Sequence, residues 1–593
     1  MTRTAICCAL LLVLGWSGST SAEEPWPVKV EGFVAPKPGE HPRLIFRRSD
    51  IPALRAKART PEGKAMIERL KTVLGSTLTL PEKYSTDKPV NNLNEKSVGT
   101  QPLGTWTLSH GTGYGLLYVL TGEKHYADLA RQCVDKIFAG QVDRDSRYNW
   151  TTPGTGFRMS YVLQSICLTY DLCADAWDED YKKSVVEKVM NTNQKKVNKN
   201  KYYTLERLAD ADGYPPTSNH YGAYLLGPGL VALTFKGEPG ADDARLEKIQ
   251  ATVEKNLKKV LTAGFGDYGW FSEGISCGRI AANNGVLPLM QSLKVAGGLD
   301  YITPRVNGRA TVLRLMHEIV PTGKWVDEKA GKYYPMPSRP QIPHRGDYGN
   351  NELYQRPIIS HMGDFAHGMG AVTDREAAAM AWIYANFIEP EGIEKWNMGP
   401  YPHLGLYAFV NWPETRIDPD EVLPHVIADT THGYYAARNR WQDNKDALVT
   451  TLLKRGPHGY KSGRVGRGTS VWALQVKHGF GGLSGQTTHY RPGADGSMEL
   501  ADEKGQALVV DMSQTSGAYL LVARFGKDDY NDKRHDKAKV SNVQVAGKDV
   551  AVMTFSESGH PEVEVDGNAI RVGKQAIQVG EGKLTLETFK PAE

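Results

Sequence analysis

The chain has 593 residues, of which 40% are hydrophobic and 23% charged, which excludes a collagen-like or wholly disordered chain. The length predicts more than one domain, because single hydrophobic cores stop growing at roughly 250–300 residues. The formal net charge is only +4, so the sequence lacks the domain-wide basic surface expected of a nucleic-acid-binding protein.

Residues 1–22 predict a cleavable secretory signal peptide. Arg3 precedes an apolar run at 5–14, and small or polar residues follow as far as Ala22. The run is shorter than the roughly 20 residues that a membrane-spanning helix needs. We therefore expect a secreted or periplasmic protein without a membrane span.

Two of the six cysteines lie in the signal peptide, and the others contain no CxxC pair. Their spacing fits neither a zinc ribbon nor a disulfide scaffold. Either one bridge joins Cys167 to Cys173, or all the remaining cysteines are small buried core residues. These are Cys133, Cys167, Cys173 and Cys277.

From residue 49 onward the pattern predicts paired amphipathic helices joined by short links that contain Gly, Asp or Pro. The pairs recur roughly every 45–60 residues, which indicates a solenoid or a closed toroid of helical hairpins. The predicted segments are 113–120 with 125–138, 159–176 with 181–191, 221–233 with 243–261, 284–296 with 311–319, and 370–387.

Near residue 415 the pattern changes to short alternating runs separated by Gly, Asp and Asn, which predicts an antiparallel β-sandwich. We therefore expect an α/α toroid at 23–415, an incomplete barrel of helical hairpins, and a β-sandwich at 416–593. The clearest predicted strands are 470–476, 497–500, 507–511, 518–525, 542–545, 563–565 and 583–589.

Two segments of the predicted toroid carry groups suited to chemistry. Asn219, His220 and Tyr221 begin a helix, where free backbone N–H groups and side chains share one space. The alternative is a helix cap with a packed histidine. The segment 266–274 crowds glycines, aromatic residues and two carboxylates together, as a sugar-binding platform would. It could equally be a loop that plugs the end of the barrel.

Further titratable residues follow in loop-like surroundings. Residues 344–348 read His-Arg-Gly-Asp-Tyr and 361–364 read His-Met-Gly-Asp. In the predicted sandwich, His489 precedes a strand and Asp511 closes the next one. A histidine and aspartates at strand ends are suitable metal ligands, although a surface loop is the commoner role.

Several of these segments resemble the heparinase II/III-like and alginate-lyase-like polysaccharide lyases. They are HPRLIF at 41–46, the Asn-His helix start at 219–220, the FSEG stretch at 271–274, GYYAAR at 433–438, and the stretch 489–511. The resemblance extends over about 41–515. It implies an α/α toroid followed by a β-sandwich, and cleavage of uronic-acid polysaccharides by β-elimination.

In that reaction the substrate carboxylate is neutralised by Asn, His or Arg, after which Tyr or His removes the C5 proton and Tyr protonates the leaving oxygen. By resemblance, Asn219 and His220 fall at the neutralising and base positions. His489 falls on the first histidine of the sandwich signature, which reaches into the cleft. Asp511 falls on a metal-ligand position of the zinc-containing members.

The sequence departs from the family pattern at two positions. Cys277 stands about where the family tyrosine is expected, so Tyr268 becomes the most available acid or base, with Tyr221 or Tyr348 as alternatives. Arg491 replaces the second histidine of the sandwich signature, so we predict no structural zinc and no cofactor.

The sequence thus predicts an exported lyase whose partner is an acidic polysaccharide. The predicted catalytic residues are Asn219, His220, Tyr268 and His489. The predicted substrate-binding residues are Tyr221, Trp270, Glu273, Arg279, Arg345, Tyr348, His361 and Arg491.

Two other functions fit the same pattern. A glycoside hydrolase on the same toroid would pair Glu273 with Asp347 or Asp364 at a separation of roughly 5–10 Å. A non-catalytic carbohydrate-binding protein on a lyase-like fold would account for Cys277 at the tyrosine position.

Overall fold

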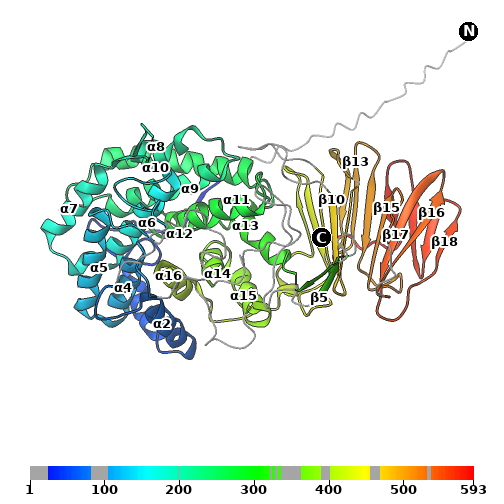
Figure 1. Cartoon of the computed structure of the whole chain (residues 1–593), viewed down its shortest axis with the longest axis horizontal. Helices are drawn as coiled ribbons and strands as arrows, with labels where there is room; N and C mark the ends of the chain where they lie inside the picture. Colours follow the sequence, from blue (N-terminus) through cyan, green and yellow to red (C-terminus); the bar gives the residue numbers. More distant parts are fainter. Residues whose placement is uncertain are drawn as a thin grey trace, which may run out of the picture.

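The computed structural model contains a helical part and a β part that follow one another along the long axis of the molecule (Figure 1). The predicted signal peptide lies outside the residues that it describes. These are 25–81, 104–143, 145–197, 199–320, 324–327, 332–335, 362–388, 401–453, 468–481, 483–530 and 536–592.

The helical part has an inner and an outer layer, and composition decides which helix lies in which. Helices that are apolar on all sides form the inner layer, because a helix of this kind is stable only when it is surrounded. These are α4 (His110–Thr121), α6 (Gly156–Cys173) and α9 (Asn219–Phe235). Amphipathic helices cover them and turn a charged face to solvent: α5 (Lys124–Phe138), α7 (Glu179–Met190) and α10 (Asp243–Lys259).

The inner helices α6 and α9 pack closely because glycine stands at their contact. A Cβ atom at Gly227 would lie 2.7 Å from the Cα of Ser160. The other helices continue the hairpin pattern predicted from sequence. They are α1 (Ile51–Lys57), α2 (Pro61–Leu74), α8 (Leu205–Ala209), α11 (Ile275–Ala281), α12 (Leu287–Gly297), α13 (Val306–His317), α14 (Met362–Met369), α15 (Asp374–Ile383) and α16 (Pro402–Asn411).

In the part of the chain that the structure describes, the β part consists of three sheets. The first has the order β6-β5-β11-β10-β9-β8-β7, the second β12-β13-β14-β15-β17-β16 and the third β18-β19-β20-β21. The strands of the first sheet are β5 (Lys324–Asp327), β6 (Lys332–Pro335), β7 (Val426–Asp429), β8 (Tyr434–Arg438), β9 (Leu448–Leu452), β10 (Gly468–Ala473) and β11 (Val476–Phe480). Those of the second are β12 (Thr487–Pro492), β13 (Met498–Asp502), β14 (Ala507–Asp511), β15 (Leu520–Phe525), β16 (Ala538–Val545) and β17 (Lys548–Phe555), and those of the third are β18 (Val563–Asp566), β19 (Ala569–Val572), β20 (Gln575–Val579) and β21 (Leu584–Leu586).

The hydrophobic cores show how these layers stack. One core fills the helical part and includes Tyr434 and Trp472 of the first sheet, so this sheet packs on the helices. A second core lies between the first and second sheets, and a third joins the second sheet to the small third sheet. The prediction of a helical toroid followed by an antiparallel sandwich is confirmed, and the third sheet adds a layer to it.

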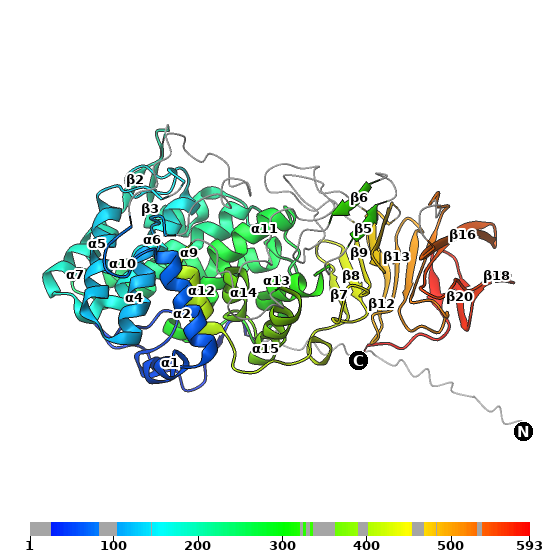
Figure 2. The ribbon, with the colours of Figure 1, turned by 60° about the horizontal axis from the view of Figure 1, so that its bottom comes forward.

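The hairpin β5–β6 comes from the helical half of the sequence, between α13 and α14, but belongs to the first sheet. β5 pairs in parallel with β11, and β6 pairs antiparallel with β5. The predicted domain division after residue 415 falls between α16 and β7. The helical half of the sequence therefore contributes two strands to the β part (Figure 2).

The buried carboxylate of Asp429, at the end of β7, binds the backbone of the loop 266–274 in the helical part. Its oxygens accept the backbone N–H groups of Tyr268 (3.1 Å), Trp270 (3.0 Å) and His432 (3.0 Å). Gly266 allows this approach, because it has a positive φ of 65° and a Cβ atom there would lie 2.3 Å from the carboxylate. The indole of Trp270 stacks on Tyr434 of β8 beside it, with 4.2 Å between the ring centroids.

The four cysteines of the described chain are buried, and no disulfide bond joins any two of them. Cys167 and Cys173 both lie on α6, and no bridge joins them. The sequence left open either a bridge between Cys167 and Cys173 or small buried core residues, and the structure agrees with the second alternative.

Replacing Asp429 with alanine should lower the free energy of unfolding by about 3 kcal/mol, because it leaves buried backbone N–H groups without an acceptor. Thermal unfolding followed by calorimetry measures this. Glu421→Ala is the matched control, since Glu421 is an exposed carboxylate a few residues earlier. Equal melting temperatures for the two variants would contradict the assigned role of Asp429.

The same residue predicts a pH dependence. Burial alone would raise the pKa of Asp429, but hydrogen bonds from His432 lower it below its ordinary value. The stabilisation by this carboxylate is then complete at pH values above its unfolded-state pKa, about 4, and is lost as the pH falls through the lower folded-state pKa. The stability difference between wild type and Asp429→Ala should therefore shrink only in strong acid.

Candidate functional site

The loop fastened by Asp429 also holds the first turn of α9. The hydroxyl of Ser272 donates to the carbonyl oxygen of Thr217 (2.6 Å), and a carboxylate oxygen of Glu273 accepts the backbone N–H of Asn219 (2.8 Å). Glu273 is buried. A carboxylate at this position satisfies a free N–H group and complements the positive end of the helix. Glu273 therefore positions Asn219 and His220.

His220 lies in an aromatic enclosure at the start of α9. Its imidazole stacks on Tyr214, with 4.7 Å between centroids and 14° between planes, and meets the edges of Phe157 (5.3 Å) and Tyr224 (5.8 Å). The ring is half-buried. Its Nδ1 atom has no hydrogen-bond partner among the described residues.

The surroundings of His220 keep its imidazole neutral. Burial lowers its pKa, the cations Arg158 and Lys196 lower it further, and the resulting pKa is about 4. Arg158 itself is buried, with its guanidinium 4.5 Å from the centre of the Phe157 ring. A neutral imidazole next to a guanidinium combines a proton acceptor with a cation that can bind a carboxylate.

Ring contacts extend this enclosure through the inner layer of helices. The Phe157 ring contacts Tyr148, with 6.4 Å between ring centroids, and Tyr148 contacts Tyr161 (5.3 Å). Tyr161 in turn contacts His403 of α16 (5.5 Å). His403 lies 6.0 Å from His367 of α14. We call the rings His220, Phe157, Tyr148, Tyr161, His403 and His367 the inner aromatic row.

Several polar atoms of the inner aromatic row are enclosed without a partner. The hydroxyl of Tyr161, Nδ1 of His403 and Nε2 of His367 make no hydrogen bond with the described residues. Buried polar atoms of native proteins are normally satisfied, so unpaired atoms on neighbouring rings are candidates for contact with a ligand. Burial raises the pKa of Tyr161 and lowers that of His367 to about 3. The tyrosine is thus a proton donor and the histidines are neutral.

The sequence analysis did not single out Tyr161, His367, His403 or Arg158. Tyr161 and Arg158 lie on α6, whose apolar composition indicates only a core helix. A partial signal was present in the i, i+4 spacing of Phe157 with Tyr161 and of His403 with Tyr407, since such pairs share one helix face.

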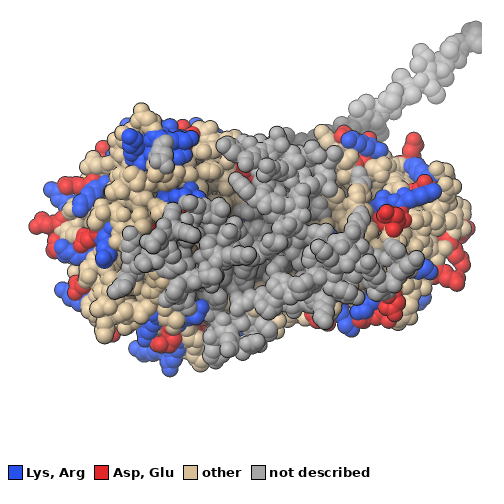
Figure 3. Space-filling model, in the orientation of Figure 1, with Lys and Arg blue, Asp and Glu red and all other residues tan. Residues whose placement is uncertain are grey.

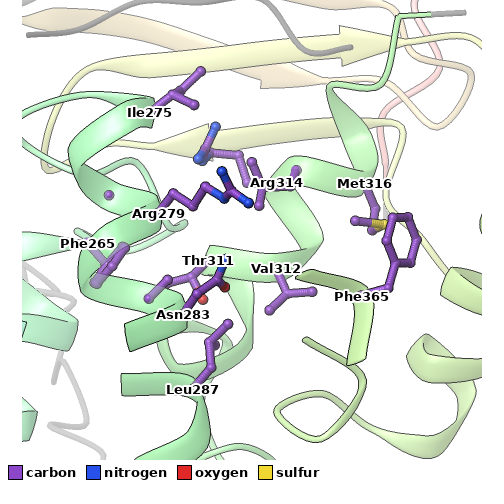
Figure 4. Close-up of a pocket in the computed structure, with 13 residues that line it drawn as sticks. Phe265, Ile275, Arg279, Asn283, Leu287, Thr311, Val312, Arg314, Met316 and Phe365 are labelled. Carbon is purple, nitrogen blue, oxygen red and sulfur yellow. The ribbon is translucent and has the colours of Figure 1, made fainter. Parts of the chain in front are cut away.

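A pocket lies between α11 and α13 (Figure 4). Arg279 and Arg314 extend into it from its two sides, and Phe265 and Phe365 form part of its apolar wall. Arg314 donates to Glu318 (2.6 Å). The predicted substrate-binding residue Arg279 thus lines a pocket that contains two guanidinium groups.

The structure does not bring Tyr268 to His220. Glu376, Arg309 and Tyr490 act electrostatically on the Tyr268 side chain, whereas the rings that contact His220 are Tyr214, Phe157 and Tyr224. Burial raises the pKa of Tyr268. Trp270 lies in the junction with the first sheet, stacked on Tyr434 rather than offering a ring face to a sugar.

His489 and Arg491 also lie elsewhere. Both bind the buried carboxylate of Glu499 on β13, each at 3.1 Å, and Glu499 also accepts the backbone N–H of Leu586 on β21. The intervening Tyr490 points to the other face of β12, toward Tyr435. The predicted reach of His489 into the cleft is therefore absent, because its face of β12 is turned to the third sheet.

The remaining predicted residues are placed as follows. Tyr221 is buried within α9, and Asp511 accepts the backbone N–H of Ser513 at the end of β14 (2.9 Å). In the described residues no group of three His, Cys, Asp or Glu side chains could hold a metal ion. Arg345, Tyr348, His361 and Asp347 lie outside the described residues, and the side chain of Asp364 is likewise not described.

Comparison with known proteins gives no family model and no curated sequence that matches. Solved structures are similar over most of the chain. A heparinase III shares 10% identity, over 91% of this chain and 98% of its own, with a TM-score of 0.39. Heparan sulfate lyase HepC from Pedobacter heparinus shares 12%, over 90% and 93%, with a TM-score of 0.36. Chondroitin AC lyase of Streptomyces coelicolor A3, in complex with chondroitin sulphate, shares 11%, over 90% and 76%, with a TM-score of 0.38.

We predict that His220 stays neutral from pH 5 to pH 8, because its pKa of about 4 lies below that range. Imidazole carbon shifts in a histidine-labelled sample, with the signal identified by its loss in His220→Asn, measure this. Arg158→Met should raise the pKa of His220, because Arg158 has the largest electrostatic effect of the cations that lower it. Between pH 6.5 and 4 the unfolded chain binds more protons at this residue than the folded one, so acidification through that window destabilises the fold. A titration midpoint near 6.5 in the wild type would contradict the assigned environment.

Proposed function

We propose that the chain is an exported polysaccharide lyase that cleaves an acidic, uronic-acid-containing glycan by β-elimination. The observation that carries this proposal is the neutral, half-buried imidazole of His220, held at the start of α9 beside the Arg158 guanidinium. β-Elimination needs a base and a cation at one carbon centre, because the C5 proton becomes acidic only when the neighbouring carboxylate is neutralised.

Each group of the enclosure has a step in this reaction. Arg158 and Asn219 bind the uronate carboxylate. His220 accepts the C5 proton, and the electron pair of that C–H bond forms the C4–C5 double bond as the C4–O bond breaks. Tyr161 donates its hydroxyl proton to the leaving oxygen, and its raised pKa means that this hydroxyl is protonated before the reaction. Glu273 acts as a positioning residue, since it contacts the backbone of Asn219 and not the substrate.

This assignment replaces the acid derived from the sequence and keeps one of the substrate-binding residues. Tyr161 takes the place of Tyr268, since the groups that act electrostatically on Tyr268 are Glu376, Arg309 and Tyr490 and not His220. Arg279 keeps its predicted role in substrate binding, because it lines a pocket, and Ala281 of the same helix packs against Gly222 in the first turns of α9. Export is proposed from the signal-like residues 1–22. No helix of the described chain is long and apolar enough to span a bilayer.

The hydrolase alternative has less support from the described residues. It needs Glu273 as one member of a carboxylate pair, whereas Glu273 is buried and accepts a helix N–H group. A carboxylate held in this way acts as a helix cap, and its hydrogen-bonding oxygen is already occupied. The non-catalytic alternative was based on Cys277 at the tyrosine position, and Tyr161 supplies that hydroxyl from another helix.

We predict that His220→Ala lowers the turnover of a uronic-acid polysaccharide by about a thousandfold, the usual range for loss of a general base. Ultraviolet absorbance measures the reaction directly, because elimination leaves a conjugated C4–C5 double bond and hydrolysis leaves none. His125→Ala is the matched control, since His125 lies on the outer helix α5 with a side chain 41% exposed. Circular dichroism and melting temperature check that both variants are folded.

A panel of uronic-acid polysaccharides provides the substrates for this assay. Rising absorbance with wild type and the His125→Ala variant, but not with His220→Ala, supports the lyase and identifies its substrate class. New reducing ends without absorbance would favour the hydrolase. Activity of His220→Ala close to that of wild type would overturn the proposed mechanism.

A further inference from the structure

A short basic hairpin lies next to the His220 enclosure. Strands β2 (Asn193–Lys195) and β3 (Tyr202–Thr204) pair antiparallel and project from the helical part (Figure 2). Its connection is held by the N–H of Lys196, which donates to the carbonyl oxygen of Lys201 (2.7 Å), and by that of Val197, which donates to Pro153 (3.2 Å). We call residues 193–204 the basic hairpin.

The basic hairpin is fixed to the wall of the enclosure by its buried tyrosine. Tyr203 packs edge-on against Tyr224 of α9, with 6.2 Å between centroids, and Tyr224 contacts His220. Lys196 and Lys201 both act electrostatically on His220. The hairpin cations thus lie in the field of the proposed base without contacting it.

The lysines of the basic hairpin outnumber their acidic partners. Lys201 pairs with Asp212, which Arg207 also binds (2.5 Å). Lys195, Lys196 and Lys199 form no ion pair with any carboxylate in the described chain. Burial lowers the pKa of Lys196, and the neighbouring Lys199 and Lys201 lower it further. Cations that crowd one another gain from an anionic ligand, because it removes their mutual repulsion.

An exposed aromatic ring accompanies these cations. Tyr202 is 40% exposed and stands directly opposite Lys195 in the strand register, so the two side chains share one face of the hairpin. Val197 is also exposed. Figure 3 shows Lys and Arg side chains gathered on the helical half in this region, near α8. A tyrosine face beside lysines suits a sugar ring that carries negative charge.

We propose that the basic hairpin is a second glycan-binding surface, which holds anionic groups of the polysaccharide at sugar residues beyond the one that reacts at His220. This inference rests on the proposed function, because it assumes that the chain being cleaved passes through the enclosure. The ligand is a polyanionic glycan, and its anionic groups are carboxylates or sulfates. The surface contributes affinity for long chains and no chemistry.

The test measures binding separately from turnover. The combined variant Lys195→Gln, Lys196→Gln and Lys199→Gln is compared with Lys248→Gln, Lys255→Gln and Lys259→Gln, which removes the same charge from exposed positions on α10. Both are made in full-length protein that also carries His220→Ala, and titration calorimetry follows binding of long polyglucuronate or heparin at several salt concentrations.

We expect the hairpin variant to bind the long chain about tenfold more weakly than the α10 variant, with a shallower dependence on salt. Binding of a disaccharide should be the same in both. Tyr202→Ala should weaken binding while leaving the salt dependence unchanged. A stronger effect with heparin than with polyglucuronate identifies sulfate as the anion bound, and the reverse identifies carboxylate.

The outcomes separate this inference from the proposed function. If the protein binds and cleaves a polyanionic glycan but the hairpin and α10 variants bind it equally, the hairpin surface is wrong and the lyase stands. If the hairpin variant loses affinity for disaccharide and polymer alike, the lysines belong to the reaction centre and the second surface is wrong. If the intact protein binds no polyanionic glycan, both proposals fail.

Discussion

The carboxylate of Asp429 links the β part of the molecule to the chemistry proposed for the helical part. It fixes the backbone at Tyr268 and Trp270, and a few residues later the same loop supplies Glu273. Glu273 accepts the N–H of Asn219, so the orientation of the first α9 turn depends on a residue of β7. The sheets therefore do more than cover the helices, because they determine where the imidazole of His220 lies.

The enclosure combines features that usually oppose stability. Its rings bury polar atoms without partners among the described residues, and burial together with nearby cations keeps the imidazole of His220 unprotonated. A protein core without a function would replace these groups by apolar ones, since unsatisfied polar atoms cost free energy. Arg158 illustrates this point, because it is buried against Phe157 and Tyr148 and still lies within range of His220.

The sequence predicted the architecture because hydrophobic periodicity is a local property, and the change of period near residue 415 is clear. It also predicted the helix start at Asn219 and His220, which the structure has, and Glu273 contacts that helix start. It could not select Tyr161 over Tyr268, because a tyrosine inside an apolar helix reads as core until its neighbours are known. The position of His489 could not be predicted for a related reason. The alternation of side chains along β12 decides which face of the sheet His489 occupies, and only the pairing of the strands reveals that face.

The hairpin β5–β6 ties the helical part to the β part by shared chain. It leaves the helical part after α13, completes the edge of the first sheet beside β11, and returns to α14. Because of this hairpin, the helical part and the β part are not independent units joined by a single linker. A fragment ending near residue 415 would carry two strands with no sheet to join, and the complementary fragment would expose the edge of β11 to other chains. Each part therefore needs the other to pair the backbone N–H and C=O groups of its strands.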